Sequence, residues 1–345
     1  MKRRNMLKSA AAAALALGLL PSTALAQEVT LRLHQFLPAP ATVPKHILKP
    51  WAAAVEERAG GKLKIEHFDS MALGGKPPGL MDQAIDGVAD IVMTVVGYTP
   101  GRFPKTEVFE LPFMMTNPVA TSKAFQSLVE TDLQDGEYKD VKVLGAWVHG
   151  PGVIHTATGV SKFEDLEGLK MRGPTRVIND MLQELGAIPV GLPLPAIPEA
   201  LSKGVVSGTV IPWEVTPAIK LSELVKYHTE FVGEEAFYTA TIVLVMNKAK
   251  YDSLPDDVRA AIDAESGQRL SEMAATVMWA KDAPGRAIAE DAGNSIIQLS
   301  EAEVARFKAK SQPVIDRWVS EMDTKGIDGR GLIETAKGLI KEHGG

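Results

Sequence analysis

The 345-residue sequence contains no cysteine. Disulfide frameworks, thiolate metal sites, cysteine nucleophiles and lipid-modified cysteine anchors are therefore excluded. Long apolar runs are scarce as well, because after the first 26 residues no stretch approaches the roughly 18 apolar residues that a membrane-spanning helix needs. These absences predict a soluble mature protein without covalent cross-links.

The sequence also lacks an excess of positive charge. Its formal net charge is −6, and because the first 26 residues hold four basic and no acidic residues, the remainder carries −10. An acidic surface argues against nucleic acid or an anionic membrane as the main partner, so an anionic ligand would need a local site. The length, with 45% hydrophobic residues, exceeds what one compact core normally holds and predicts two domains.

Residues 1–26 have the pattern of a signal peptide. A basic start is followed by an apolar run over residues 10–20 and by Ala24-Leu25-Ala26, a small-x-small cleavage pattern. Residues 3–8 approximate a twin-arginine signal, which leaves the Sec and twin-arginine routes both open. We expect an exported, periplasmic protein that starts near Gln27.

Strands and helices alternate along the first half of the chain. Period-two and buried apolar runs predict strands over residues 29–33, 62–68, 89–95 and 141–148, and helical spacing predicts helices over 43–59 and 73–85. This alternation is typical of a mostly parallel sheet covered by helices. Further on, the pattern predicts a returning strand over residues 236–247 and a long helix from Leu254 to Pro284.

Residues 163–214 repeat the alternation and carry the first candidate site. Strands are expected near residues 168–172, 188–190 and 205–211, with helices between them. In open α/β sheets ligands bind outside the carboxyl ends of strands, where this segment places Arg172 and Glu214. A guanidinium suits a carboxylate because it donates two parallel charge-assisted hydrogen bonds. From spacing alone, a surface ion pair is the more common role for such an arginine.

The same segment resembles the solute-binding proteins of tripartite ATP-independent periplasmic (TRAP) transporters, of the DctP type. The resemblance rests on an ordered set of motifs that spans essentially the whole mature chain. They are Leu166, Gly168, Lys170 and Arg172, residues 186–189 and 204–208, and residues 56–63, 71–75, 87–91 and 108–113.

This resemblance implies a type II-like periplasmic binding protein fold with two lobes, mixed sheets, a cleft between the lobes and a long helix that spans both. We expect residues 27–148 and 239–278 in lobe I and residues 149–238 and 279–345 in lobe II. It also implies that Arg172 binds a ligand carboxylate, that the Tyr98 loop contacts the ligand, and that a monomer delivers the ligand to TRAP membrane permease subunits.

The sequence departs from the family pattern at two positions. Many members carry a second arginine about twenty residues before the first, where this chain has Gly152, and an asparagine where it has Ile211. These changes remove polar contacts, whereas Trp213, Tyr98 and Phe36 offer amphipathic or apolar surface. We therefore expect a small organic monocarboxylate, such as a 2-oxo, hydroxy or aromatic acid.

The remaining candidates are weaker. Gln35 follows the first strand, His149 and His155 lie near the crossing into the second lobe, and Tyr238 starts the returning strand. Seven scattered histidines without metal-ligand spacing predict no metal, and no motif indicates a cofactor. An alternative function is an exported lyase or isomerase that acts on a carboxylic acid, with Glu214 as general base. A ligand-presenting partner of a chemoreceptor would share the same binding chemistry.

Overall fold

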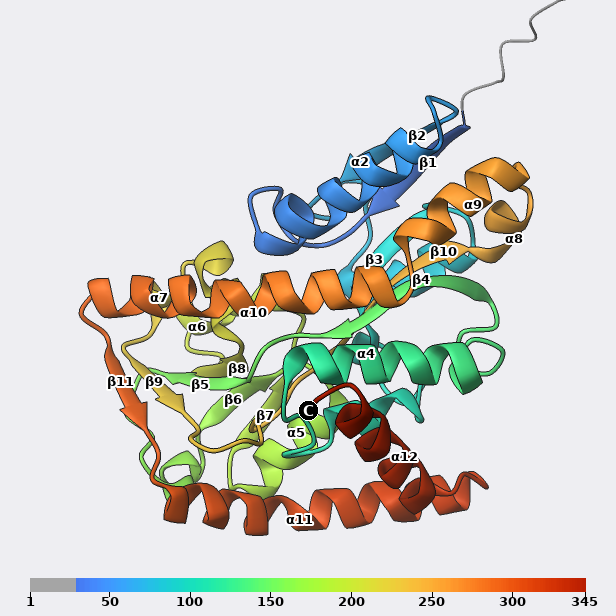
Figure 1. Ribbon diagram of the computed structural model, residues 1–345. Helices are drawn as coiled ribbons and strands as arrows, with labels where there is room; N and C mark the ends of the chain where they lie inside the picture. The colour runs from blue at the N-terminus through green and yellow to red at the C-terminus, as the bar shows by residue number, and fades with distance from the viewer. Residues whose placement is uncertain (1–28) are drawn as a thin grey trace, which may run out of the picture.

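The computed structural model describes residues 29–345, so the predicted signal peptide lies outside the described residues. These residues form two mixed β-sheets covered by helices (Figure 1), and the predicted α/β fold class is confirmed. None of the helices in residues 29–345 is both long and apolar enough to cross a membrane.

The first sheet has the strand order β2-β1-β3-β10-β4. Its strands are β1 (Val29–His34), β2 (Leu63–Phe68), β3 (Ile91–Val95), β4 (Val141–Val148) and β10 (Thr241–Asn247). β1 lies parallel to β2 and β3, whereas β10 is antiparallel to both β3 and β4. Every residue of β3 is buried, as its nearly continuous apolar run requires.

The second sheet has the strand order β11-β9-β5-β8-β6-β7. Its strands are β5 (Val153–Thr156), β6 (Lys170–Gly173), β7 (Ile188–Gly191), β8 (Gly208–Ile211), β9 (Tyr227–Glu230) and β11 (Ser295–Gln298). The parallel strands β7, β6 and β8 come from the segment that the sequence identifies as strand, helix, strand, helix, strand.

Helices cover both sheets. The α-helices are α2 (Lys49–Arg58), α3 (Leu80–Ile85), α4 (Pro118–Leu128), α5 (Arg176–Glu184), α6 (Ile197–Ser202), α7 (Leu221–Leu224), α8 (Lys248–Asp252), α9 (Asp256–Glu265), α10 (Gln268–Asp291), α11 (Glu301–Thr324) and α12 (Gly329–Glu342). Short 3-10 helices include η3 (Val96–Tyr98), η4 (Thr106–Glu110), η7 (Leu194–Ala196) and η8 (Trp213–Ile219). Near the C-terminus, α11 packs on α5 and α12 packs on α4.

The expected long helix is present but differs in its bounds. It bends between α9 and α10 at Gly267, whose φ of 64° suits glycine and whose amide donates to the carbonyl of Leu144 at 2.7 Å. Pro284 does not end it, and α10 runs past both sheets to Asp291 (Figure 1). Next to Pro284, Gly285 lies directly against the backbone carbonyl of Trp213. The close packing of α10 on η8 at this glycine stabilises the helix beside the proline.

The chain crosses between the sheets twice in extended form. Residues 149–152 join β4 to β5, and residues 231–240 join β9 to β10. The two crossings lie side by side, because the amide of Gly152 donates to the carbonyl of Tyr238 at 3.0 Å and the Thr239 hydroxyl donates to the carbonyl of His149 at 2.7 Å. The exact division of the chain into two lobes remains a proposal.

Candidate functional site

A cavity lies where the two sheets meet. It encloses about 60 Å³ of space accessible to the centre of a water molecule. Residues that follow β1, β3 and β8 at their carboxyl ends line it together with β6, so both sheets contribute. The lining residues are Phe36, Leu37, Val43, Met93, Val95, Tyr98, His149, Arg172, Pro174, Leu194, Ile211, Pro212, Glu214, Val215, Tyr238, Ala240, Ile242 and Met278.

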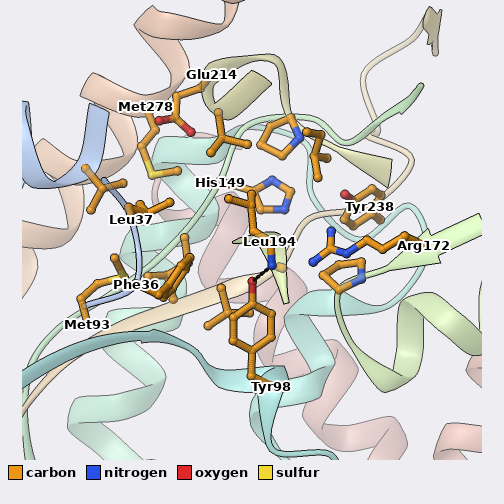
Figure 2. Close-up of a pocket in the computed structure, with 18 residues that line it drawn as sticks. Phe36, Leu37, Met93, Tyr98, His149, Arg172, Leu194, Glu214, Tyr238 and Met278 are labelled. Atoms are coloured by element: carbon orange, nitrogen blue, oxygen red, sulfur yellow. Dashed lines mark hydrogen bonds between the residues drawn. The ribbon is translucent and has the colours of Figure 1, made fainter. Parts of the chain in front are cut away.

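Arg172 projects from β6 into this cavity (Figure 2) and is 1% exposed. Its Nε donates to the carbonyl of Leu192 at 2.7 Å and its Nη1 to the carbonyl of Val210 at 3.3 Å. Burial lowers the pKa of the guanidinium, and no carboxylate within residues 29–345 is among the groups that offset this effect. The backbone therefore orients a buried cation whose charge no anion of the described chain neutralises.

Aromatic and aliphatic side chains form most of the remaining wall. Phe36 and Tyr98 pack with ring centroids 5.6 Å apart, and the Tyr98 hydroxyl accepts a hydrogen bond from the amide of Leu194 at 3.0 Å. Met93 and Met278 extend the apolar surface on the side away from Arg172 (Figure 2). Such a wall favours an apolar ligand body over a densely hydroxylated one.

His149 lines the cavity as a neutral imidazole. Burial, with a smaller contribution from the Arg172 charge, lowers its pKa to about 4. Its Nδ1 lies 2.6 Å from the carbonyl oxygen of Gly150 and must carry the proton, since that oxygen can only accept. Among residues 29–345, Arg172 is thus the only cation that lines the cavity at neutral pH.

Glu214 is the one carboxyl group of the wall, and it begins η8 together with Trp213. Burial raises its pKa to about 8. The hydrogen bond with the Thr42 hydroxyl partly opposes this rise, and the nearby Asp282 carboxyl adds to it. Its backbone amide donates to Oδ1 of Asp282 at 2.8 Å. At neutral pH the Glu214 side chain therefore stays protonated.

Three predicted site residues do not line the cavity. The amide of Gln35 is used within its own loop, where it donates to the carbonyl of Leu37 and to Asp69, both at 2.7 Å. Trp213 points to the opposite side of its segment, where its indole donates to Glu230 at 2.8 Å. His155 packs edge-on against this indole at 5.0 Å between ring centroids.

A continuous series of hydrogen bonds holds His155 in this position. Its Nε2 donates to the carbonyl of Ile211 at 3.1 Å, so its Nδ1 must accept from Nδ1 of His228 at 2.6 Å. Nε2 of His228 then accepts from Asn294 at 3.0 Å. Both imidazoles are neutral, because burial lowers the pKa of each.

Several lining residues were not foreseen. Met93 and Val95 belong to β3, Ala240 and Ile242 to the end of the second crossing and β10, and Met278 to α10. In the sequence, these apolar positions are indistinguishable from core positions, because the same periodicity serves both. Within residues 29–345 no group of three or more histidine, aspartate or glutamate side chains is placed to hold a metal ion.

Two helix-covered β-sheets around a cavity with one buried cation and apolar walls are typical of a solute-binding protein. Comparison with known sequences agrees, since the profile of the bacterial extracellular solute-binding proteins of family 7 (DctP) matches residues 35–321. The chain belongs to this family, which comprises the periplasmic solute-binding proteins of TRAP transporters. The family resemblance seen in the sequence is thus confirmed.

Solved structures and a curated relative resemble this chain over most of its length. A TRAP solute-binding protein from Rhodoferax ferrireducens T118, in complex with copurified benzoate, is 49% identical with a TM-score of 0.90, over 91% of this chain and 98% of that one. A marine metagenome TRAP solute-binding protein specific for aromatic acid ligands, in complex with 3-hydroxybenzoate, is 46% identical with a TM-score of 0.90. The match covers 92% of this chain and 100% of that one. The C4-dicarboxylate-binding periplasmic protein of Rhodobacter capsulatus is 24% identical, and the match covers 79% of this chain and 81% of that protein.

Proposed function

We propose that this protein binds a small aromatic monocarboxylate in the cavity and delivers it to TRAP permease subunits. The observation that carries the proposal is Arg172, a buried cation without a carboxylate partner in the described chain, at one end of an otherwise apolar cavity. The ligand carboxylate pairs with the guanidinium, and the ring lies against Phe36, Tyr98 and the methionines. The benzoate and 3-hydroxybenzoate complexes of the two similar structures support this ligand class.

The protein acts in this proposal as a periplasmic monomer after removal of residues 1–26. Contacts with residues from both sheets favour the closed arrangement, because a ligand shifts a conformational equilibrium only through its differential affinity for the two states. The predicted preference for one carboxylate follows from the single cation of the wall, since a second ligand carboxylate would lie in an apolar environment without a counter-charge.

An exported lyase or isomerase with Glu214 as base is the weaker alternative. A carboxyl with a pKa of about 8 holds its proton at neutral pH and cannot accept another. The relatives are solute-binding proteins, and we propose that this chain is likewise not an enzyme. Recovery of ligand unchanged after prolonged incubation would support binding, and its consumption would favour the enzyme.

The test is titration calorimetry of the mature protein with benzoate, 3-hydroxybenzoate and mandelate, with succinate and galactonate for comparison. Aromatic monocarboxylates should bind and succinate should not. Arg172→Met, which keeps most of the side-chain volume, should weaken benzoate binding by about 2 to 5 kcal/mol, the cost of removing one partner of a desolvated charge pair.

The matched control is Arg102→Met, because Arg102 pairs with Asp82 on the surface and does not line the cavity. It should bind benzoate like the wild type. Circular dichroism would establish that both variants are folded. Unchanged benzoate affinity in folded Arg172→Met protein would refute the carboxylate assignment.

A further inference from the structure

Tyr238 carries a buried hydroxyl that has no hydrogen-bond partner within residues 29–345. The side chain is 0% exposed and lines the cavity. Burial raises the pKa of the phenol above its ordinary value, and the Arg172 charge opposes the shift, so the hydroxyl keeps its proton. A buried hydroxyl without a partner costs free energy, and a donor turned toward a cavity can recover it from a ligand.

The absence of a side chain at Gly152 leaves the space that the Tyr238 ring occupies. A Cβ at position 152 would lie 2.0 Å from Cε1 and 2.6 Å from Cζ of Tyr238, distances at which the ring must move. The two residues are held in register by the hydrogen bond from the Gly152 amide to the Tyr238 carbonyl. Position 152 therefore needs glycine because the aromatic ring occupies the space that a side chain would fill.

The Tyr238 ring is further held close to Arg172. The imidazole of His149 packs against it edge-on with centroids 5.4 Å apart, and Phe237 packs on it at 5.9 Å. Arg172 and Tyr238 act on one another electrostatically, each being among the influences on the other's pKa. Figure 2 shows both side chains at the same end of the cavity, opposite Glu214 and Met278.

We propose that Tyr238 donates the second hydrogen bond to the ligand carboxylate that Arg172 binds, and that Gly152 is the positioning residue that makes this possible. One cation and one neutral donor then bind a single carboxylate, whose two oxygens can accept from both. The phenol adds hydrogen bonding without a second charge, so it contributes to selection of monoanionic ligands. This inference rests on the proposed function.

The hydroxyl is tested with Tyr238→Phe and benzoate titration. The substitution removes one oxygen and keeps the ring against Gly152 and His149. Loss of a hydrogen bond to a charged group predicts an affinity about ten- to a hundredfold lower. The thermal midpoint of the ligand-free protein should stay unchanged or rise, because the substitution removes an unpaired buried hydroxyl.

The matched control is Tyr138→Phe. Tyr138 is equally buried, but its hydroxyl lies 3.0 Å from the Thr106 hydroxyl and it does not line the cavity. Its substitution should lower the thermal midpoint and leave benzoate affinity unchanged, the reverse of the pattern expected for Tyr238→Phe.

Gly152 is tested with a double-mutant cycle. Gly152→Ala should lower benzoate affinity in the wild-type background, where the added methyl displaces the ring. In a Tyr238→Ala background the methyl has room, and Gly152→Ala should cause no further loss of affinity or of thermal midpoint. Equal losses in both backgrounds would overturn the positioning role.

The outcomes separate the two proposals. Wild-type affinity in Tyr238→Phe, while Arg172→Met loses binding, would overturn the role of the phenol and leave the proposed function standing. A wild-type protein that binds none of the aromatic monocarboxylates would overturn both.

Discussion

At the scale of single residues, Glu214 gives the cavity a pH dependence. Its carboxyl ionises as the pH rises through about 8, and neighbouring Asp282, which faces it from α10, has a pKa raised by burial to about 7. Arg172 and neutral His149 are the other ionisable groups besides tyrosines in the wall. Above these pKa values new negative charge lies at the end of the cavity opposite Arg172, where it would repel an anionic ligand.

We therefore expect benzoate affinity to fall by roughly tenfold as the pH rises from about 6 to about 9, because like charges repel across the cavity at an effective dielectric constant near 20. Glu214→Gln cannot ionise, so its affinity should fall less over the same range, the remainder coming from Asp282. Calorimetry at several pH values checks this. Parallel profiles for the two proteins would contradict the role of Glu214.

Which residues line the cavity is only partly encoded in local sequence. Strand ends place Arg172 and Tyr98 near the cavity, but the local pattern of each is also typical of a surface ion pair or a packing residue, and the family resemblance is what predicts ligand contact. Trp213 illustrates what sequence does not reveal. It stands between Pro212 and Glu214, which both line the cavity, yet its ring turns toward Glu230 and two histidines that come from distant strands.

At the scale of elements, Arg176 at the start of α5 links three segments. Its guanidinium pairs with both oxygens of Glu107 on η4 and with Glu321 on α11 at 2.7 Å. Trp318 of α11 donates to Glu107 at 3.2 Å. Elements that flank the first sheet and the second sheet are thereby connected outside the cavity.

Arg176→Ala should lower the free energy of unfolding by about 2 to 3 kcal/mol, since it leaves the largely buried Glu107 carboxylate without its cation. The exposed pair of Arg102 and Asp82 offers the control, and Arg102→Ala should cost less than about 1 kcal/mol. Urea denaturation measures both. Equal effects would show that the Arg176 cluster behaves as an ordinary surface ion pair.

Element types were more predictable than element boundaries. Strong periodicity predicts β1, α2 and the β6 to β8 segment, and a nearly continuous apolar run predicts β3. The sequence does not predict the bend at Gly267, because the helical pattern continues across it and the turn depends on the contact with Leu144. Likewise, β9 has no alternation in its Tyr-His-Thr-Glu sequence and owes its pairing to β5 and β11.

At the scale of the whole molecule, closure around the ligand is expected to change the overall dimensions. Small-angle X-ray scattering of the ligand-free protein should give a larger radius of gyration than the benzoate-saturated protein, because the proposed closure brings the two sheets closer together. Arg172→Met protein should show no change with benzoate. Identical curves with and without ligand, in protein that calorimetry shows to bind, would contradict closure.

The two crossing segments that join the sheets also carry His149, Gly152 and Tyr238. If the sheets turn about these segments, as the proposed closure requires, the proposed ligand lies next to the axis, where a rotation displaces atoms least. The same rotation would displace the edge strands β2 and β7 more, because in the strand order they lie farthest from the strands that the crossings join. Under the proposed function, a small rotation around the bound acid would therefore become a larger displacement at the outer edges of the two sheets.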